Sequence, residues 1–196
     1  MTIRTRLIYS KRGGACFVPH IALAQMFSRS ASRAGLTLVM TQGFSPRAKI
    51  SFGPELPAGV VALNEPVDMF FVNVPENITR LINDSLPEGF SVSRVIFPSD
   101  ESPSLGKLCK SADYLIRSVS NISLAEHAQN FYGDSLILIE QNGEWLRMIT
   151  ADPSQNPIGG FIRYLKDKEI IAGWHELNTV RVSVGLYNPQ NRSVSL

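Results

Sequence analysis

Hydrophobic and polar residues alternate near the start of the chain. Within residues 3–10, Ile3 and Leu7 fall on one face of an extended backbone, whereas Arg4 and Arg6 fall on the other. A period of two residues is typical of a β-strand with one buried face. The sequence therefore predicts that the chain opens with a strand.

A different period follows. Residues 20–34 repeat their apolar side chains every three to four positions, which predicts a helix that begins after Pro19 and ends at Gly35. Three further strands and one helix are predicted: strands at 36–41, 67–74 and 90–97, and a helix at about 77–86. The order β-α-β-β-α-β is that of the ferredoxin-like fold.

The same order of elements recurs after a polar segment. The predicted elements are a strand at 112–119, a short helix opened by a Ser123–Glu126 capping box, strands at 135–140 and 144–150, a helix opened by Asn156–Pro157, and a strand at 178–187. The sequence thus predicts an α+β fold of two tandem ferredoxin-like (βαββαβ) units with antiparallel sheets. The expected boundaries are a first unit at 1–98, a linker at 99–111 and a second unit at 112–196.

Composition limits the class of protein. The chain has 196 residues, of which 44% are hydrophobic and 18% charged, as in ordinary globular domains. Two cysteines exclude a disulfide scaffold and a zinc finger. No apolar run is long enough to span a membrane, and the first residues lack the apolar core of a signal peptide. We expect a cytoplasmic protein with reduced thiols.

Known catalytic and cofactor motifs are missing. The sequence has no Walker, dinucleotide-binding or nucleophile-elbow pattern, and its three histidines do not stand at metal-ligand spacings. We therefore expect no cofactor and no metal site.

Charge is distributed unevenly along the chain. Residues 1–60 contain eight basic side chains and one acidic one, a formal charge of +7, whereas the rest of the chain carries −5. This asymmetry indicates an anionic partner for the first half. The alternative is that the basic residues only solvate a surface.

The segment 42–66 is a long loop rich in glycine and proline. Its backbone N–H groups, together with Arg47 and Lys49, could hold phosphates. Alternatively, the loop could serve to pack Phe44 and Phe52 into the core.

The basic residues of the first half are the candidate binding groups. In a ferredoxin-like fold the helices cover one sheet face, and RNA-recognition domains bind single strands on the other. Arg4 and Arg6 would lie on that open face, or at the rim of a packed one. The predicted anion- or nucleic-acid-binding residues are Arg4, Arg6, Arg29, Arg33, Gly43, Phe44, Arg47 and Lys49.

One side chain could be catalytic. His20 follows the Gly13–Gly14 turn at a helix start, where a neutral imidazole could act as a general base on a ribose hydroxyl. The alternative is a histidine that caps or packs locally, because the spacing supplies no acid or lysine partner.

Residues 17–60 resemble the radical-SAM-linked protein family, whose members read F-L-S-H-L-D-L and then S-Q-G-F-N-P-H-P-K-I-S-F. The matching residues are Phe17, His20 and Leu23 in the first block, Gln42, Gly43, Phe44, Pro46, Lys49, Ile50, Ser51 and Phe52 in the second, and Leu56, Pro57, Gly59 and Val60 after it. The resemblance implies a partner that is a cobalamin-binding radical-SAM protein.

This chain departs from the family pattern at two positions. Ala22 stands where the family has an acidic residue, and Arg47 stands where it has a histidine. A site built from those groups would be largely lost here, and Cys16 and Cys109 cannot form an iron–sulfur motif, so radical chemistry would belong to the partner. The element order with His20 also resembles the repeat-associated CRISPR RNA-processing endonucleases at the level of fold.

Three functions stay open. The first is a non-catalytic accessory module that binds RNA or another anionic ligand beside a radical-SAM partner. The second is a metal-independent endoribonuclease that uses His20. The third is a scaffold that binds only the partner protein.

Overall fold

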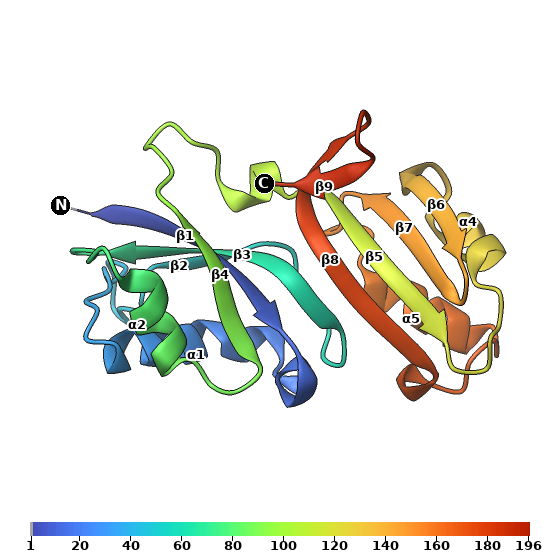
Figure 1. The fold of residues 1–196 in the computed structure, drawn as a ribbon, viewed down its shortest axis with the longest axis horizontal. Coiled ribbons are helices and arrows are strands. Elements are labelled where there is room, and N and C mark those ends of the chain that lie inside the picture. Colours follow the sequence, from blue (N-terminus) through green and yellow to red (C-terminus); the bar gives the residue numbers. More distant parts are fainter. Residues whose placement is uncertain (1) are drawn as a thin grey trace.

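The computed structural model describes residues 2–196, and its first half is a βαββαβ unit (Figure 1). The elements are β1 (Ile3–Lys11), a 3-10 turn (Gly13–Phe17), α1 (His20–Arg33), β2 (Ile50–Phe52), β3 (Val61–Phe71), α2 (Ile78–Ser85) and β4 (Phe90–Ile96). The spatial order is β4-β1-β3-β2, and each pair is antiparallel.

The second half repeats this arrangement after a connector that contains α3 (Leu105–Leu108). Its elements are β5 (Ser111–Ser118), α4 (Ala125–Tyr132), a 3-10 turn (Gly133–Ser135), β6 (Leu136–Asn142), β7 (Trp145–Ala151), α5 (Ile158–Asp167), a 3-10 turn (Trp174–Glu176), β8 (Leu177–Asn188) and β9 (Ser193–Ser195). The order β8-β5-β7-β6 matches the first unit strand for strand. The predicted fold class, α+β with two tandem ferredoxin-like units, is confirmed.

The two sheets are joined into one. Strands β3 and β8 run parallel and pair at Val61 with Val180 and at Ala62 with Arg181. Beyond that short contact the two strands diverge, as Figure 1 shows. The junction is therefore narrow at one end and open at the other.

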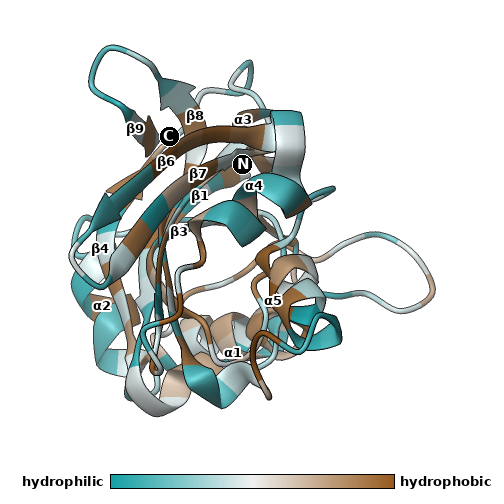
Figure 2. Ribbon diagram, turned by 90° about the vertical axis from the view of Figure 1, so that its right-hand side faces the viewer, coloured by the Kyte–Doolittle hydropathy of each residue, from teal (hydrophilic) through white to brown (hydrophobic). Residues whose placement is uncertain are grey.

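Each unit has its own hydrophobic core beneath the sheet. In Figure 2, α1, α4 and α5 lie on the same side of it. The first core includes Leu7, Phe27 and Met69. The second is centred on aromatic and aliphatic residues of β5, β7 and α5, and it also takes in Leu56 and Val60 from the first half. The second core is thus completed by the loop that precedes β3.

The predicted strand at 36–41 is not formed as a continuous strand. Leu38 makes an isolated bridge to Phe71, and the strand that pairs with the middle of β3 is instead Ile50–Phe52. The edge of the sheet is thus shared by two short pieces of chain, and the excursion between them projects from it. A single strand prediction could not anticipate this division.

The predicted linker at 99–111 is folded against the sheet. It contains α3, whose Leu105 is fully buried in the second core, and Ser111 already belongs to β5. The predicted capping box is not formed either. Helix α4 begins at Ala125, and no side chain caps its first turn.

The helices are short. Across residues 2–196, none is both long enough and apolar enough to traverse a lipid bilayer.

Candidate anion-binding surfaces

Arg4 and Arg6 lie on the sheet face opposite the helices, where both guanidinium groups bind the carboxylate of Asp68. Asp68 on β3 accepts hydrogen bonds from Arg4 Nη2 at 2.6 Å and from Arg6 Nε at 2.7 Å. Arg4 also donates to the carbonyls of Ser102 and Pro103, each at 2.8 Å. The two arginines thus fasten the connector across the sheet. Both guanidinium groups therefore already have acceptors within the protein, and Asp68 offsets one of their two positive charges. Their role as phosphate ligands stays a prediction.

The excursion between Leu38 and β2 is a closed, projecting loop. Thr41 and Arg47 bridge its neck, with the Thr41 N–H donating to the Arg47 carbonyl at 2.7 Å and the Arg47 N–H to Thr41 Oγ1 at 3.0 Å. Gly43 adopts φ +135°, which favours glycine. Phe44 is fully exposed at this loop, so the interpretation that it packs into the core is wrong. Phe52 does pack there, 6.0 Å from the ring of Phe27.

Two cations follow Phe44 in the same segment of chain. Arg47 and Lys49 are both exposed, and no ion pair engages either of them within residues 2–196. Lys49 Nζ lies 4.3 Å from the centroid of the Phe70 ring, a cation–π contact on the open sheet face. The loop therefore presents one aromatic ring and two positive charges to solvent. We call residues 41–49 the basic–aromatic loop.

The predicted cations of α1 behave differently from each other. Arg33 donates to the carbonyl of Ser85 at 2.6 Å and to Ser30 Oγ at 3.0 Å, and so ties α1 to the end of α2. Arg29 is exposed. Both belong to the helix layer, whereas Lys49 lies on the open face, so the structure does not collect the predicted cations into one site.

His20 begins α1 and is half-buried. Its ring packs edge to face on Phe52, with 5.4 Å between centroids. Burial lowers the pKa of His20, opposed by the nearby carboxylate of Glu55. The imidazole is therefore neutral near pH 7, as a general base must be. Among the described residues it has no side-chain hydrogen bond that would orient it.

The sequence analysis did not identify the buried ion pair at the junction of the two units. Arg181 on β8 donates to Glu65 on β3 at 2.7 and 2.5 Å, and both side chains are almost fully buried. Arg181 also donates to the carbonyls of Pro54 and Glu55, which anchors the chain that leaves β2. The available signal was that both strands are largely apolar, and that β8 contains one basic residue while β3 contains two acidic ones, Glu65 and Asp68.

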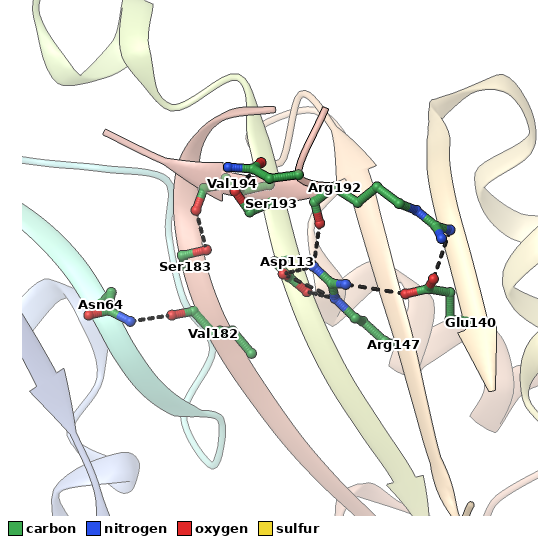
Figure 3. Close-up of polar contacts among 10 residues, drawn as sticks. Asn64, Asp113, Glu140, Arg147, Val182, Ser183, Arg192, Ser193 and Val194 are labelled. Atoms are coloured by element: carbon green, nitrogen blue, oxygen red, sulfur yellow. Dashed lines mark hydrogen bonds and ion pairs between the residues drawn. The ribbon is translucent and has the colours of Figure 1, made fainter. Parts of the chain in front are cut away.

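A second feature that sequence reasoning missed is a cavity of about 410 Å³ where β3 and β8 diverge. It opens on the face opposite the helices, and Figure 3 shows the polar contacts around it. Asn64 bridges its narrow end by donating to the carbonyl of Val182 at 2.9 Å. Ser183 donates to the carbonyl of Val194 on β9 at 2.7 Å.

An ion-pair network closes the cavity on the side of the second unit. Arg147 donates to Asp113 at 2.8 Å, to Glu140 at 3.2 Å and to the carbonyl of Arg192 at 2.6 Å (Figure 3). Arg192 in turn pairs with Glu140 at 2.7 Å. These contacts pin the β8–β9 hairpin over the open face of the second unit. Across residues 2–196, no cluster of three or more acidic, histidine or cysteine side chains could hold a metal ion.

The chain belongs to a family described as an uncharacterized protein conserved in bacteria (DUF2344), whose match covers residues 4–151. The match spans the first unit, the connector and the second unit as far as β7. A comparison with curated proteins found no match.

Solved structures with detectable likeness include two with descriptive names. One is a candidate glycine cleavage system transcriptional repressor, with 10% identity and a TM-score of 0.28 over 95% of this chain and 99% of the other. The other holds the first two RRM domains of the yeast poly(U)-binding protein Pub1, with 10% identity and a TM-score of 0.25 over 90% of this chain and 99% of the other. At these TM-scores the likeness carries no argument about function.

Proposed function

We propose that the protein is a non-catalytic binding module whose basic–aromatic loop binds single-stranded RNA. The observation that supports this most is Phe44, a fully exposed ring in the same loop as two exposed positive charges that no ion pair engages within residues 2–196. Aromatic side chains stack on unpaired bases, and adjacent cations attract the phosphates between them. The +7 charge of residues 1–60 would strengthen the attraction at longer range.

Hydrogen bonds at the base of the basic–aromatic loop also fix its conformation, with Phe44 exposed. The two hydrogen bonds between Thr41 and Arg47 close its neck, and Lys49 is fixed against Phe70. A preorganised loop loses less conformational entropy when it binds than a flexible one. The geometry thus favours binding over a role as a passive connection.

The test measures binding of a labelled oligouridylate across a salt series in EDTA. Arg47→Ala together with Lys49→Ala should remove two phosphate contacts and flatten the slope of log K against log salt by about 1.4. Phe44→Ala should weaken binding by about 1–3 kcal/mol at every salt concentration.

The matched controls are Arg80→Ala, an exposed arginine on α2, and Phe97→Ala, an exposed ring after β4. Neither should change binding. If the loop variants bind like the parent protein, the loop is not the RNA site.

A ribonuclease activity of His20 has one feature in its favour, the partial burial that lowers the pKa of its imidazole. The same gels test it, because cleavage in EDTA should leave 2′,3′-cyclic phosphate ends and stop in His20→Ala. Cleavage that persists in that variant would exclude His20 as the base.

We also propose that the module works in the cytoplasm beside a radical-SAM partner protein, on the strength of the resemblance in residues 17–60. Co-purification of such a partner through the tagged protein would support this. A complex that forms tightly while the protein leaves oligouridylate unbound would favour the scaffold function instead.

A further inference from the structure

A cavity of about 450 Å³ begins where the basic–aromatic loop ends. One wall is the open face of β2 and β3, where the strand register places Ser51 beside Asp68 and Phe70 follows two residues later. The opposite wall is the connector, which Arg4 holds across the sheet through two backbone carbonyls. The volume lies within the range of small-molecule sites, about 300–1,000 Å³.

Phe70 supplies an aromatic ring to this cavity. Its neighbours Met69 and Phe71 are fully buried in the core of the first unit, so Phe70 points to the opposite face, where it is partly exposed. Lys49 Nζ lies 4.3 Å from the ring centroid, and the Phe70 N–H donates to the Lys49 carbonyl at 3.2 Å. A base can replace the ammonium on this ring, because base stacking is stronger than an exposed cation–π contact. The flexible Lys49 side chain then stays within reach of a phosphate beside that base.

Asp100 supplies a carboxylate from the connector. It is exposed, and no ion pair engages it within residues 2–196. The other carboxylate of the cavity, Asp68, is already bound by Arg4 and Arg6. An ionised carboxylate only accepts hydrogen bonds, so Asp100 favours a ligand group that donates one.

These three groups match the three parts of a ribonucleotide within a strand. Phe70 suits the base, Lys49 the phosphate and Asp100 a sugar hydroxyl. The 3′ and 5′ oxygens of an internal nucleotide are esterified, so its 2′-hydroxyl is the one donor left on the sugar. DNA lacks that hydroxyl. A carboxylate at this position would therefore distinguish RNA from DNA.

We propose that this cavity holds one nucleotide of the RNA strand, and that Asp100 selects ribose over deoxyribose by accepting a hydrogen bond from the 2′-hydroxyl. The inference rests on the proposed RNA binding and extends it from Phe44 to a second ring, Phe70, on the sheet. Lys49 both ends the basic–aromatic loop and lines the cavity, so a bound strand passes directly from one to the other.

The test compares labelled oligouridylate with oligodeoxyuridylate of the same length, which differ only in the 2′-hydroxyls. The parent protein should bind the ribo-oligomer about tenfold more tightly, the effect of one hydrogen bond to a charged group. Asp100→Ala should abolish this preference, although the loss of a negative charge should tighten the binding of both oligomers. The matched control is Glu101→Ala, which removes the same charge from the next residue, one that does not line the cavity, and should keep the preference.

Phe70→Leu keeps an apolar side chain without the aromatic ring and should weaken the binding of both oligomers about tenfold. Equal binding of the two oligomers by the parent protein, or an unchanged preference in Asp100→Ala, would overturn the proposal. If Phe44→Ala weakens binding in a protein that shows no ribose preference, the loop binds RNA and the cavity does not select it. If neither oligomer binds the parent protein, both proposals fail.

Discussion

The two units share one strand order and differ in what covers the sheet face opposite their helices. In the second unit the β8–β9 hairpin folds back over that face, where Val194 packs on Leu138 and Ile149. In the first unit only the connector crosses it, fastened at Asp68. Hydroxyl-bearing residues on either side of the crossing stay open, including Ser91 and Ser93.

The difference shows that the same fold can leave its open face covered or accessible. The second unit closes its open face with a small apolar cluster and an ion-pair network. The first unit keeps part of its open face and its projecting loop accessible, and it carries the positive charge. Which part of the open face is accessible therefore depends on the segment that covers it and not on the strand order, which the two units share.

The largest effect should come from breaking the junction. Arg181→Met leaves the carboxylate of Glu65 buried without a partner and frees the carbonyls of Pro54 and Glu55. Urea unfolding should show a loss of about 3–5 kcal/mol. The double variant Glu65→Leu with Arg181→Met removes both charges and should recover part of that loss. A single variant as stable as the parent protein would show that the pair does not hold the units together.

A smaller effect is expected where the connector crosses the first unit. Asp68→Asn leaves Arg4 and Arg6 without their carboxylate, and should cost about 2 kcal/mol of unfolding free energy. Hydrogen exchange should accelerate at the amides of 99–104 as the connector loosens. Asp84→Asn breaks an exposed pair on α2 and should change little. Unchanged exchange at the connector would argue that the arginines do not hold it.

The effect that is smallest near neutral pH, and grows only at alkaline pH, concerns the two buried thiols: Cys16 belongs to the first unit, and Cys109 is buried in the core of the second. Burial raises the pKa of both Cys16 and Cys109, and that of Cys109 to about 12 from 9.0. Because the unfolded thiol ionises first, the stability that the neutral Cys109 contributes is present below pH 9 and is lost as the pH rises toward 12.

Urea midpoints from pH 8 to 11 test this effect. The parent protein should lose up to about 1.4 kcal/mol per pH unit more than Cys109→Ala does above pH 9. Cys16→Ala supplies the matched comparison in the first unit, where Lys11 opposes the shift, so its pH slope should differ less from that of the parent. Parallel curves for all three proteins would contradict the assignment.

The sequence predicted the repeated element order because apolar spacing reports directly on which side chains are buried. Helix α1 starts after Pro19 as expected, and Gly35 ends it with φ +71°. The strand at 36–41 was wrong because its edge position is filled by two separate pieces of chain. Spacing along the chain carries no information on such a division.

The site was harder to predict than the fold. Glycine and proline indicated that residues 42–66 form a loop, but the sequence left open whether Phe44 is exposed or packed in the core, and the structure shows that it is exposed. Arg4 and Arg6 were placed on the open face, but their pairing with Asp68 was not predicted, because Asp68 is distant in sequence. The cavity was missed, because the divergence of β3 from β8 is a tertiary feature.

The contribution of Leu56 and Val60 to the second core also bears on how the chain can be divided. A fragment that begins at 99 would lack these side chains and Ala62, and would expose apolar surface that the intact chain hides. The halves are thus repeats in architecture without being independent modules. During synthesis, the first half must already be present for the second to complete its interior, so the chain would mature in the order in which it is made.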